Sequence, residues 1–210
     1  MWKLLAQKGE LRFHKIDHFR QTAEFMAETE ALMNFFGYTE DSFSGATIID
    51  LGCGSKLRSK YFRSAKIVAI EPLANDFMSQ IDWCDIKDAV KLFRLPAEEF
   101  IPELEDTANF VMCINVLDHV FDPELVLGNV YRYLRSDGEF LLSVDVHGGL
   151  DPMHPVKLDR PYLHKMFETG WEVIREYDGL FGHRLNYGKG RALSFILKKR
   201  AQLSGQDFQR

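Results

Sequence analysis

Two glycines and one glutamate are the residues whose types and spacing first indicate chemistry in this chain. The short β-branched segment Thr47–Asp50 runs into Gly52 and Gly54, and Glu71 closes the apolar run that starts at Lys66. Glycines let a backbone approach a ligand closely, and a carboxylate can accept hydrogen bonds from both hydroxyls of one ribose. This pattern is typical of an open parallel sheet that holds an adenosine-containing cofactor.

The glycine spacing bears on which cofactor is held. A dinucleotide fingerprint needs a third glycine where this chain has Leu57, and neither a Tyr-x-x-x-Lys pair nor a G-x-x-x-x-G-K-[ST] phosphate loop is present. These absences favour a nucleoside ligand without a pyrophosphate. They disfavour a nucleotide-dependent oxidoreductase, which stays open as an alternative.

Alternating strands and helices must position these residues, and they predict a doubly wound, Rossmann-like α/β fold of about seven mostly parallel strands, the last antiparallel. The chain reads as one domain, with a helical N-terminal extension (1–44), a core (45–198) and a polar tail (199–210). Strands are predicted at Thr47–Asp50, Lys66–Ile70, Lys91–Arg94, Asn109–Asn115, Glu139–Val146, Trp171–Tyr177 and Arg191–Lys198. Helices are predicted within 16–36, Ser55–Arg63, Leu73–Ile81, Glu124–Arg135 and Asp159–Glu168.

Composition restricts the class of protein. The 210 residues are 46% hydrophobic and 27% charged, with a net charge of −5 that offers no basic surface to a nucleic acid. No apolar run approaches the roughly 20 residues that span a bilayer. Cys53, Cys84 and Cys113 are odd in number and form no CxxC pair, so we expect reduced thiols, a cytoplasmic protein and no metal site.

Five segments in order give a more specific resemblance. They are Ile49–Gly54, Ile70–Pro72, Leu95–Glu99, Asn115–Val120 and Tyr133–Phe140. Together, over about Gly45 to Lys198, they resemble the class I S-adenosylmethionine-dependent methyltransferases, in particular the type 11-like branch that acts on small molecules. Where the family usually has a third glycine this chain has Lys56, which could crowd the methionine end of the cofactor.

The resemblance implies S-adenosylmethionine as the cofactor and a role for each matching residue. Backbone groups of Gly52, Cys53 and Gly54 would contact the methionine part, and Asp50 would reach its amino group. Glu71 would bind the ribose hydroxyls and Pro72 would press on the adenine. Ala97 and Glu98 would serve the adenine edge, and Asn115 would face the methionine. Glu98 and Asn115 are explained equally well as helix-start residues.

The expected reaction is in-line methyl transfer to a small-molecule acceptor, and the resemblance alone suggests a sugar or natural product as that acceptor. His147, after the fifth strand, and His119, after the fourth, are the candidate catalytic residues, because a histidine can take a proton from a hydroxyl near neutral pH. His119 is also explained, somewhat better, as a satisfied interior histidine, and His154 and His183 lie on loops that could form a lid. A non-catalytic S-adenosylmethionine-binding sensor or assembly protein is the alternative function, and the oligomeric state stays open.

Overall fold

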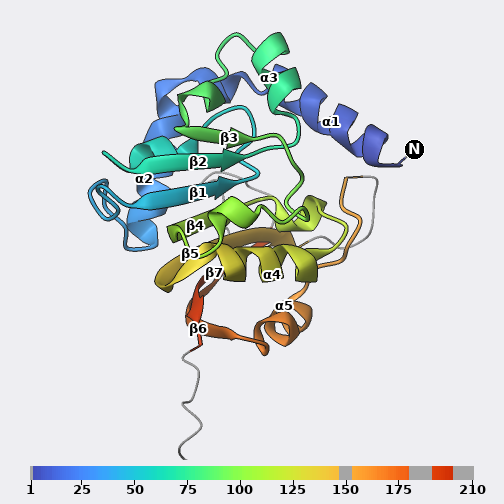
Figure 1. The fold of residues 1–210 in the computed structure, drawn as a ribbon. Coiled ribbons are helices and arrows are strands. Elements are labelled where there is room, and N and C mark those ends of the chain that lie inside the picture. Colours follow the sequence, from blue (N-terminus) through green and yellow to red (C-terminus); the bar gives the residue numbers. More distant parts are fainter. Residues whose placement is uncertain (1, 147–152, 180–190, 201–210) are drawn as a thin grey trace, which may run out of the picture.

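The computed structural model describes residues 2–146, 153–179 and 191–200, which form a seven-stranded sheet in the order β3-β2-β1-β4-β5-β7-β6 (Figure 1). The strands are β1 (Thr47–Leu51), β2 (Lys66–Ile70), β3 (Lys91–Phe93), β4 (Ala108–Ile114), β5 (Leu134–Val146), β6 (Trp171–Gly179) and β7 (Arg191–Lys199). Strand β7 runs antiparallel to both of its neighbours, and the pairs from β3 to β5 are parallel. The predicted fold class is confirmed.

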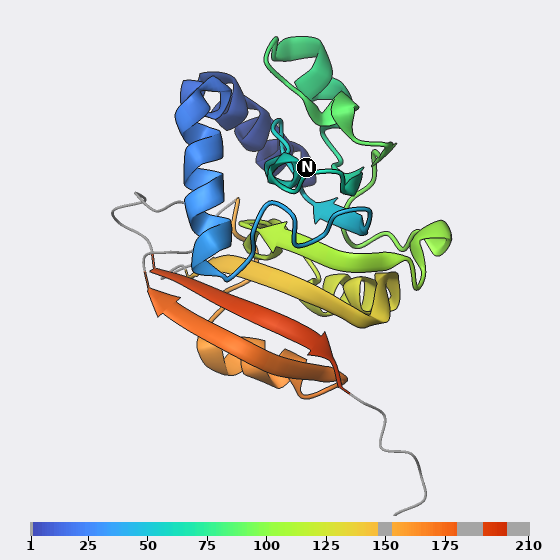
Figure 2. The same cartoon turned by 90° about the vertical axis from the view of Figure 1, so that its left-hand side faces the viewer.

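Helices cover both faces of the sheet. They are α1 (Trp2–Ile16), α2 (Ala23–Phe35), α3 (Ala74–Gln80), α4 (Pro123–Tyr133) and α5 (Arg160–Phe167). Helices α4 and α5 pack on one face, and α2 stands against the other (Figures 1 and 2). Because both faces are covered, the central strands are apolar along nearly their whole length, and Phe110 to Cys113 of β4 are essentially inaccessible to solvent.

Local sequence explains where the helix after β4 begins. The Asp122 carboxylate accepts a hydrogen bond from the backbone N–H of Leu125 at 2.9 Å, and Pro123 occupies the first helical position. The aspartate cap satisfies one of the backbone N–H groups that have no partner within the helix, and proline has no N–H to satisfy. The helix therefore starts where the sequence predicts, and it fixes the segment that precedes it.

The structure corrects the sequence predictions at three places. The segment 55–63 forms only the 3₁₀ turn η2 (Arg58–Tyr61), because the N–H of Ser59 donates to Asp50 and the carbonyl of Ser55, its partner in a helix, accepts from the N–H of Asp85. The helix predicted within 16–36 is present as α2, whereas α1, which is joined to it through the turn η1 (His18–Gln21), was not predicted. Strand β5 begins at Leu134, since it pairs with Ala108 across a bulge before its regular register.

None of the helices in the described ranges is long and apolar enough to cross a membrane.

Candidate active site

A cavity of about 420 Å³ lies at the carboxyl ends of β1, β2, β4 and β5, against α1. Its volume is within the usual range of small-molecule sites, and its position is where open α/β sheets bind ligands. All nine residues predicted to bind the cofactor line it: Asp50, Gly52, Cys53, Gly54, Glu71, Pro72, Ala97, Glu98 and Asn115. His119 lines it too, whereas His147 and His183 lie outside the described residues.

The two loop glycines are required by their conformation and their neighbours. Gly52 has φ +66° and Gly54 has φ +64°, the left-handed region that favours glycine. A Cβ at Gly52 would lie 2.5 Å from the Val116 side chain, and one at Gly54 would lie 2.5 Å from the ring of His14. Val116 and His14 thus pack directly onto the loop.

The Glu71 carboxylate is buried and already holds the loop. One oxygen accepts from the N–H of Gly54 and the other from the N–H of Leu73, both at 2.9 Å. Burial raises the pKa of Glu71 to about 7, and the two backbone donors oppose that rise. Each oxygen keeps a second lone pair, so both ribose hydroxyls can still be accepted without breaking the loop.

The Asp50 carboxylate is hydrogen-bonded to the segment that follows the glycine loop. Its Oδ2 accepts from the hydroxyl of Ser59 at 2.6 Å and from the N–H of Ser59 at 3.2 Å. Burial is the main cause that raises the pKa of Asp50 to about 6. A direct contact with the amino group of the cofactor stays a prediction.

Asn115 is the residue that fits an absent ligand best. It has φ +57° at the end of β4, where its N–H donates to the carbonyl of Ser143. Its side-chain Oδ1 is buried and has no hydrogen-bond partner among the described residues, and the residue lines the cavity. Asparagine adopts this left-handed conformation more readily than most residues, but a buried acceptor without a hydrogen-bond partner is costly unless a ligand donor completes it. The ammonium group of S-adenosylmethionine is such a donor.

The predicted adenine segment is held from behind. Asn129 of α4 donates to the carbonyls of Ala97 and Glu98 at 2.9 and 3.0 Å, and the Glu98 carboxylate accepts from the N–H of Phe121. The Glu98 side chain therefore ties two loops of the cavity together. Its contact with the adenine amino group stays a prediction.

Lys56 does not crowd the site. Its ammonium group lies 3.1 Å from the Asp85 carboxylate, which also pairs with Lys60, and Lys56 does not line the cavity. The departure from the family's third glycine therefore stabilises the segment after the loop.

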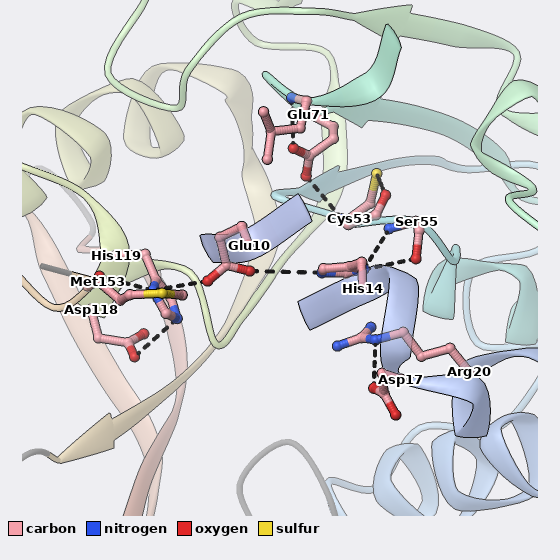
Figure 3. A network of polar contacts seen from close by, with 12 residues as sticks. Glu10, His14, Asp17, Arg20, Cys53, Ser55, Glu71, Asp118, His119 and Met153 are labelled. Carbon is pink, nitrogen blue, oxygen red and sulfur yellow. Dashed lines mark hydrogen bonds and ion pairs between the residues drawn. The ribbon is translucent and has the colours of Figure 1, made fainter. Parts of the chain in front are cut away.

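Helix α1 supplies residues that the sequence did not reveal (Figure 3). The Nδ1 of His14 accepts from the hydroxyl of Ser55 at 2.7 Å and from its N–H at 3.3 Å, and burial is the main cause that lowers the pKa of His14 to about 2. Glu10 lies between His14 and His119, at 3.8 and 3.5 Å. Arg20 of η1 also lines the cavity, with its Nε 3.0 Å from Asp17. No local motif marks these positions, because packing of the N-terminal helix brings them in.

A second group of polar side chains lies at the other end of the cavity. His119 and Asp118 come from η5 (Leu117–His119), and His154 comes from the segment after β5. The three can each offer a ligand atom, and these atoms lie within 4.8 Å of one another, which is compact enough for a metal ion. The side chain of Asp118 is 1% exposed.

Comparison with known proteins identifies the class. A family described as a methyltransferase domain matches residues 16–200, so the chain belongs to that family. The recognition of a class I S-adenosylmethionine-dependent methyltransferase is thereby confirmed, and with it the cofactor.

The curated relatives that match are ubiquinone biosynthesis O-methyltransferases. Those of Pseudomonas savastanoi and Pseudomonas putida are 27% identical over 106 residues and 28% identical over 108 residues. The matched parts are 48% and 49% of this chain, and they span less than half, 44% and 45%, of the relatives.

Solved structures share the fold at low identity. The 1,6-didemethyltoxoflavin-N1-methyltransferase of Burkholderia thailandensis, with bound 1,6-didemethyltoxoflavin and S-adenosylhomocysteine, has a TM-score of 0.60 at 16% identity. The match covers 87% of this chain and 81% of that one. The [4+2]-cyclase SpnF has a TM-score of 0.59 at 14% identity, covering 83% and 80%. Because a cyclase has the same fold, the fold alone does not identify the reaction.

Proposed function

We propose that this protein transfers the methyl group of S-adenosylmethionine in line to a hydroxyl oxygen of a small molecule, such as a sugar or a natural product. The observation that carries the proposal is one continuous cavity that joins the predicted cofactor residues to the polar group at His119. The O-methyltransferase activity in the names of the curated relatives supports an oxygen acceptor.

The cofactor would lie across the strand ends, with its ribose at Glu71 and its ammonium group at Asn115. The sulfonium is already a good leaving group, so the protein has mainly to align the two reactants and exclude water. A hydroxyl acceptor must also lose its proton. His119 lines the acceptor side of the cavity for that step, and the buried Asp118 carboxylate lies 3.5 Å from its Nε2.

Arg20 is the candidate partner of the cofactor carboxylate. It lines the cavity from η1, its guanidinium lies 5.8 and 5.7 Å from the rings of Phe13 and Phe25, and Asp17 holds its Nε. A guanidinium with a fixed orientation is well suited to a carboxylate. We expect Arg20→Met to weaken S-adenosylhomocysteine by roughly 10- to 100-fold, the value of a hydrogen bond between charged groups.

Calorimetry with two ligands tests that contact. 5′-Methylthioadenosine has the adenosine but no carboxylate, so Arg20→Met should leave its affinity unchanged. Equal losses for both ligands would mean that the substitution disturbs the cavity and that Arg20 does not bind the carboxylate. Glu71→Gln is the matched control, because it should weaken both ligands.

Turnover decides between an enzyme and a sensor. Formation of S-adenosylhomocysteine from S-adenosylmethionine would be followed with panels of phenols, sugars and amines. Turnover with hydroxyl acceptors supports the proposal, and turnover with amines alone would contradict the oxygen acceptor. Tight cofactor binding without turnover on any panel would favour the sensor.

A further inference from the structure

Asp118, His119 and His154 have the spacing of metal ligands around a shared point. The Nε2 of His119 lies 3.5 Å and the Nε2 of His154 lies 3.8 Å from the same Asp118 oxygen, Oδ2. Hydrogen bonds between nitrogen and oxygen prefer 2.7–3.2 Å, so both separations are long for direct bonding. Ligands about 2.0–2.1 Å from a tetrahedral zinc ion are roughly 3.3 Å apart, which these atoms reach with small side-chain rotations.

The tautomer of His119 also favours a role as a metal ligand. Its Nδ1 lies 3.0 Å from the backbone carbonyl of Met153, which can only accept, so Nδ1 carries the proton. Glu10 Oε1 lies 3.5 Å from the same nitrogen. The lone pair of the neutral ring is therefore on Nε2, the nitrogen that faces Asp118. A histidine that donates from one nitrogen to a carbonyl and presents the other is the usual arrangement of a metal ligand.

The surroundings favour a cation at this point. The Asp118 carboxylate is almost completely buried and the two imidazoles are about one-fifth exposed, so a bound ion would be held mainly by protein. The rings of His119 and His154 lie 4.7 Å apart, and both line the cavity. One coordination position would therefore face the space that the acceptor has to enter.

We propose that Asp118, His119 and His154 bind one divalent first-row metal ion, of which Zn²⁺ suits two imidazoles and a carboxylate, with a further position open to the acceptor. The sequence-based expectation of no metal overlooks this site because the third ligand follows β5, far along the chain from η5. The role of the ion in catalysis rests on the function proposed above, whereas its binding does not.

The chemistry that the ion supplies is acidification of the acceptor. A hydroxyl bound to a divalent metal loses its proton near neutral pH, and the proton leaves to water. The acceptor oxygen then forms its bond to the methyl carbon as the carbon–sulfur bond breaks, and neutral S-adenosylhomocysteine leaves with the electron pair.

Metal titration of the full chain, stripped with a chelator, tests the site without any acceptor. Co²⁺ would be followed by its visible absorption and Zn²⁺ by calorimetry, and we expect one equivalent to bind. Asp118→Asn and His154→Gln should each weaken that binding at least tenfold, since even the loss of a residue behind a ligand typically costs 10- to 100-fold. The matched control is His164→Gln, because His164 bonds Glu176 at the surface between α5 and β6.

Affinity for S-adenosylhomocysteine, measured in every variant, distinguishes a lost ligand from a lost fold. A variant that keeps this affinity and loses the metal supports the site. Absence of metal binding in the wild type, or equal binding in Asp118→Asn with His154→Gln combined, would overturn it. Turnover by the metal-free protein would support the proposed function and show that the ion takes no part in it. Metal binding without turnover on any acceptor would support the metal site and contradict the proposed function.

Discussion

His14 should make the stability of this protein depend on pH in a way that one substitution removes. The ring is 5% exposed, Ser55 donates to its Nδ1, and the charged or titratable side chains that face it are Glu10, Arg20 and His119. Burial lowers its pKa from 6.5 to about 2. Between pH 6.5 and about pH 2 the unfolded chain binds a proton at His14 that the folded protein excludes. The contribution of neutral His14 to the free energy of unfolding is therefore complete above about pH 7 and is lost as the pH falls.

The size of the effect depends mainly on the unfolded state. At pH 5.5, one unit below the unfolded pKa, roughly nine in ten unfolded chains carry the proton, which costs about 1.4 kcal/mol. At pH 7.5 the cost is below about 0.1 kcal/mol. Any folded pKa well under 5.5 gives the same result, and burial places that of His14 at about 2.

Urea unfolding of the wild type and of His14→Asn, at pH 7.5 and at pH 5.5, measures the contribution of His14 to the free energy of unfolding. Asparagine keeps an acceptor for Ser55 but does not titrate. Glu71 and Asp50 act in the opposite direction, because their raised pKa values of about 7 and 6 add stability as the pH falls. The two proteins must therefore be compared at equal pH, where these contributions cancel.

We expect the stability of the wild type relative to His14→Asn to fall by about 1.4 kcal/mol from pH 7.5 to 5.5. A difference that is the same at both pH values would show that His14 protonates as readily in the folded protein as in the unfolded chain. The reasoning from its burial and its bonds to Ser55 would then be refuted.

Three further outcomes follow from the loop. Glu71→Gln should weaken S-adenosylmethionine by roughly 10- to 100-fold in calorimetry, and unchanged affinity would contradict its ribose role. Gly54→Ala should destabilise the protein by at least about 1 kcal/mol more than the control Gly45→Ala. Both glycines adopt positive φ, but only the Cβ at position 54 would collide with His14, since a Cβ at Gly45 meets nothing within 4 Å. Equal unfolding midpoints of the two variants would show that His14 does not resist the added atom. Lys56→Gly should leave cofactor affinity within about twofold, since charge pairs of this kind contribute little at a distance, and a larger change would mean that the pair with Asp85 shapes the cavity.

Much of the fold could be predicted because its signals are local. The strand that ends at Leu51, the glycines after it and the acid at the end of β2 are readable from residue types over a few positions. The helix predicted over 55–63 failed for a non-local reason. The Asp50 side chain of β1 takes the N–H of Ser59, and the backbone N–H of Asp85 takes the carbonyl of Ser55, although these two groups would bond to each other in a helix.

The site divides in the same way. The nine residues predicted to bind the cofactor lie at or after strand ends, so topology alone gathers them at one edge. Glu10 and His14 reach the site because α1 packs across it, and Arg20 reaches it from the turn η1 that follows. His154 contacts His119 although the two are far apart along the chain. Pairings between distant segments leave no periodicity or motif by which a single sequence could reveal them.

Helix α1 lines both the cofactor side and the acceptor side of the cavity. His14 packs on Gly54 beside the cofactor loop, and a Cβ at Gly9 would lie 2.5 Å from the sulfur of Met153 on the acceptor side. Attempts to change the range of acceptors by redesigning this helix should therefore alter cofactor affinity at the same time. Phe121, which is half-exposed and lines the cavity from the segment between η5 and α4, offers a position at which acceptor selectivity can be varied without altering α1.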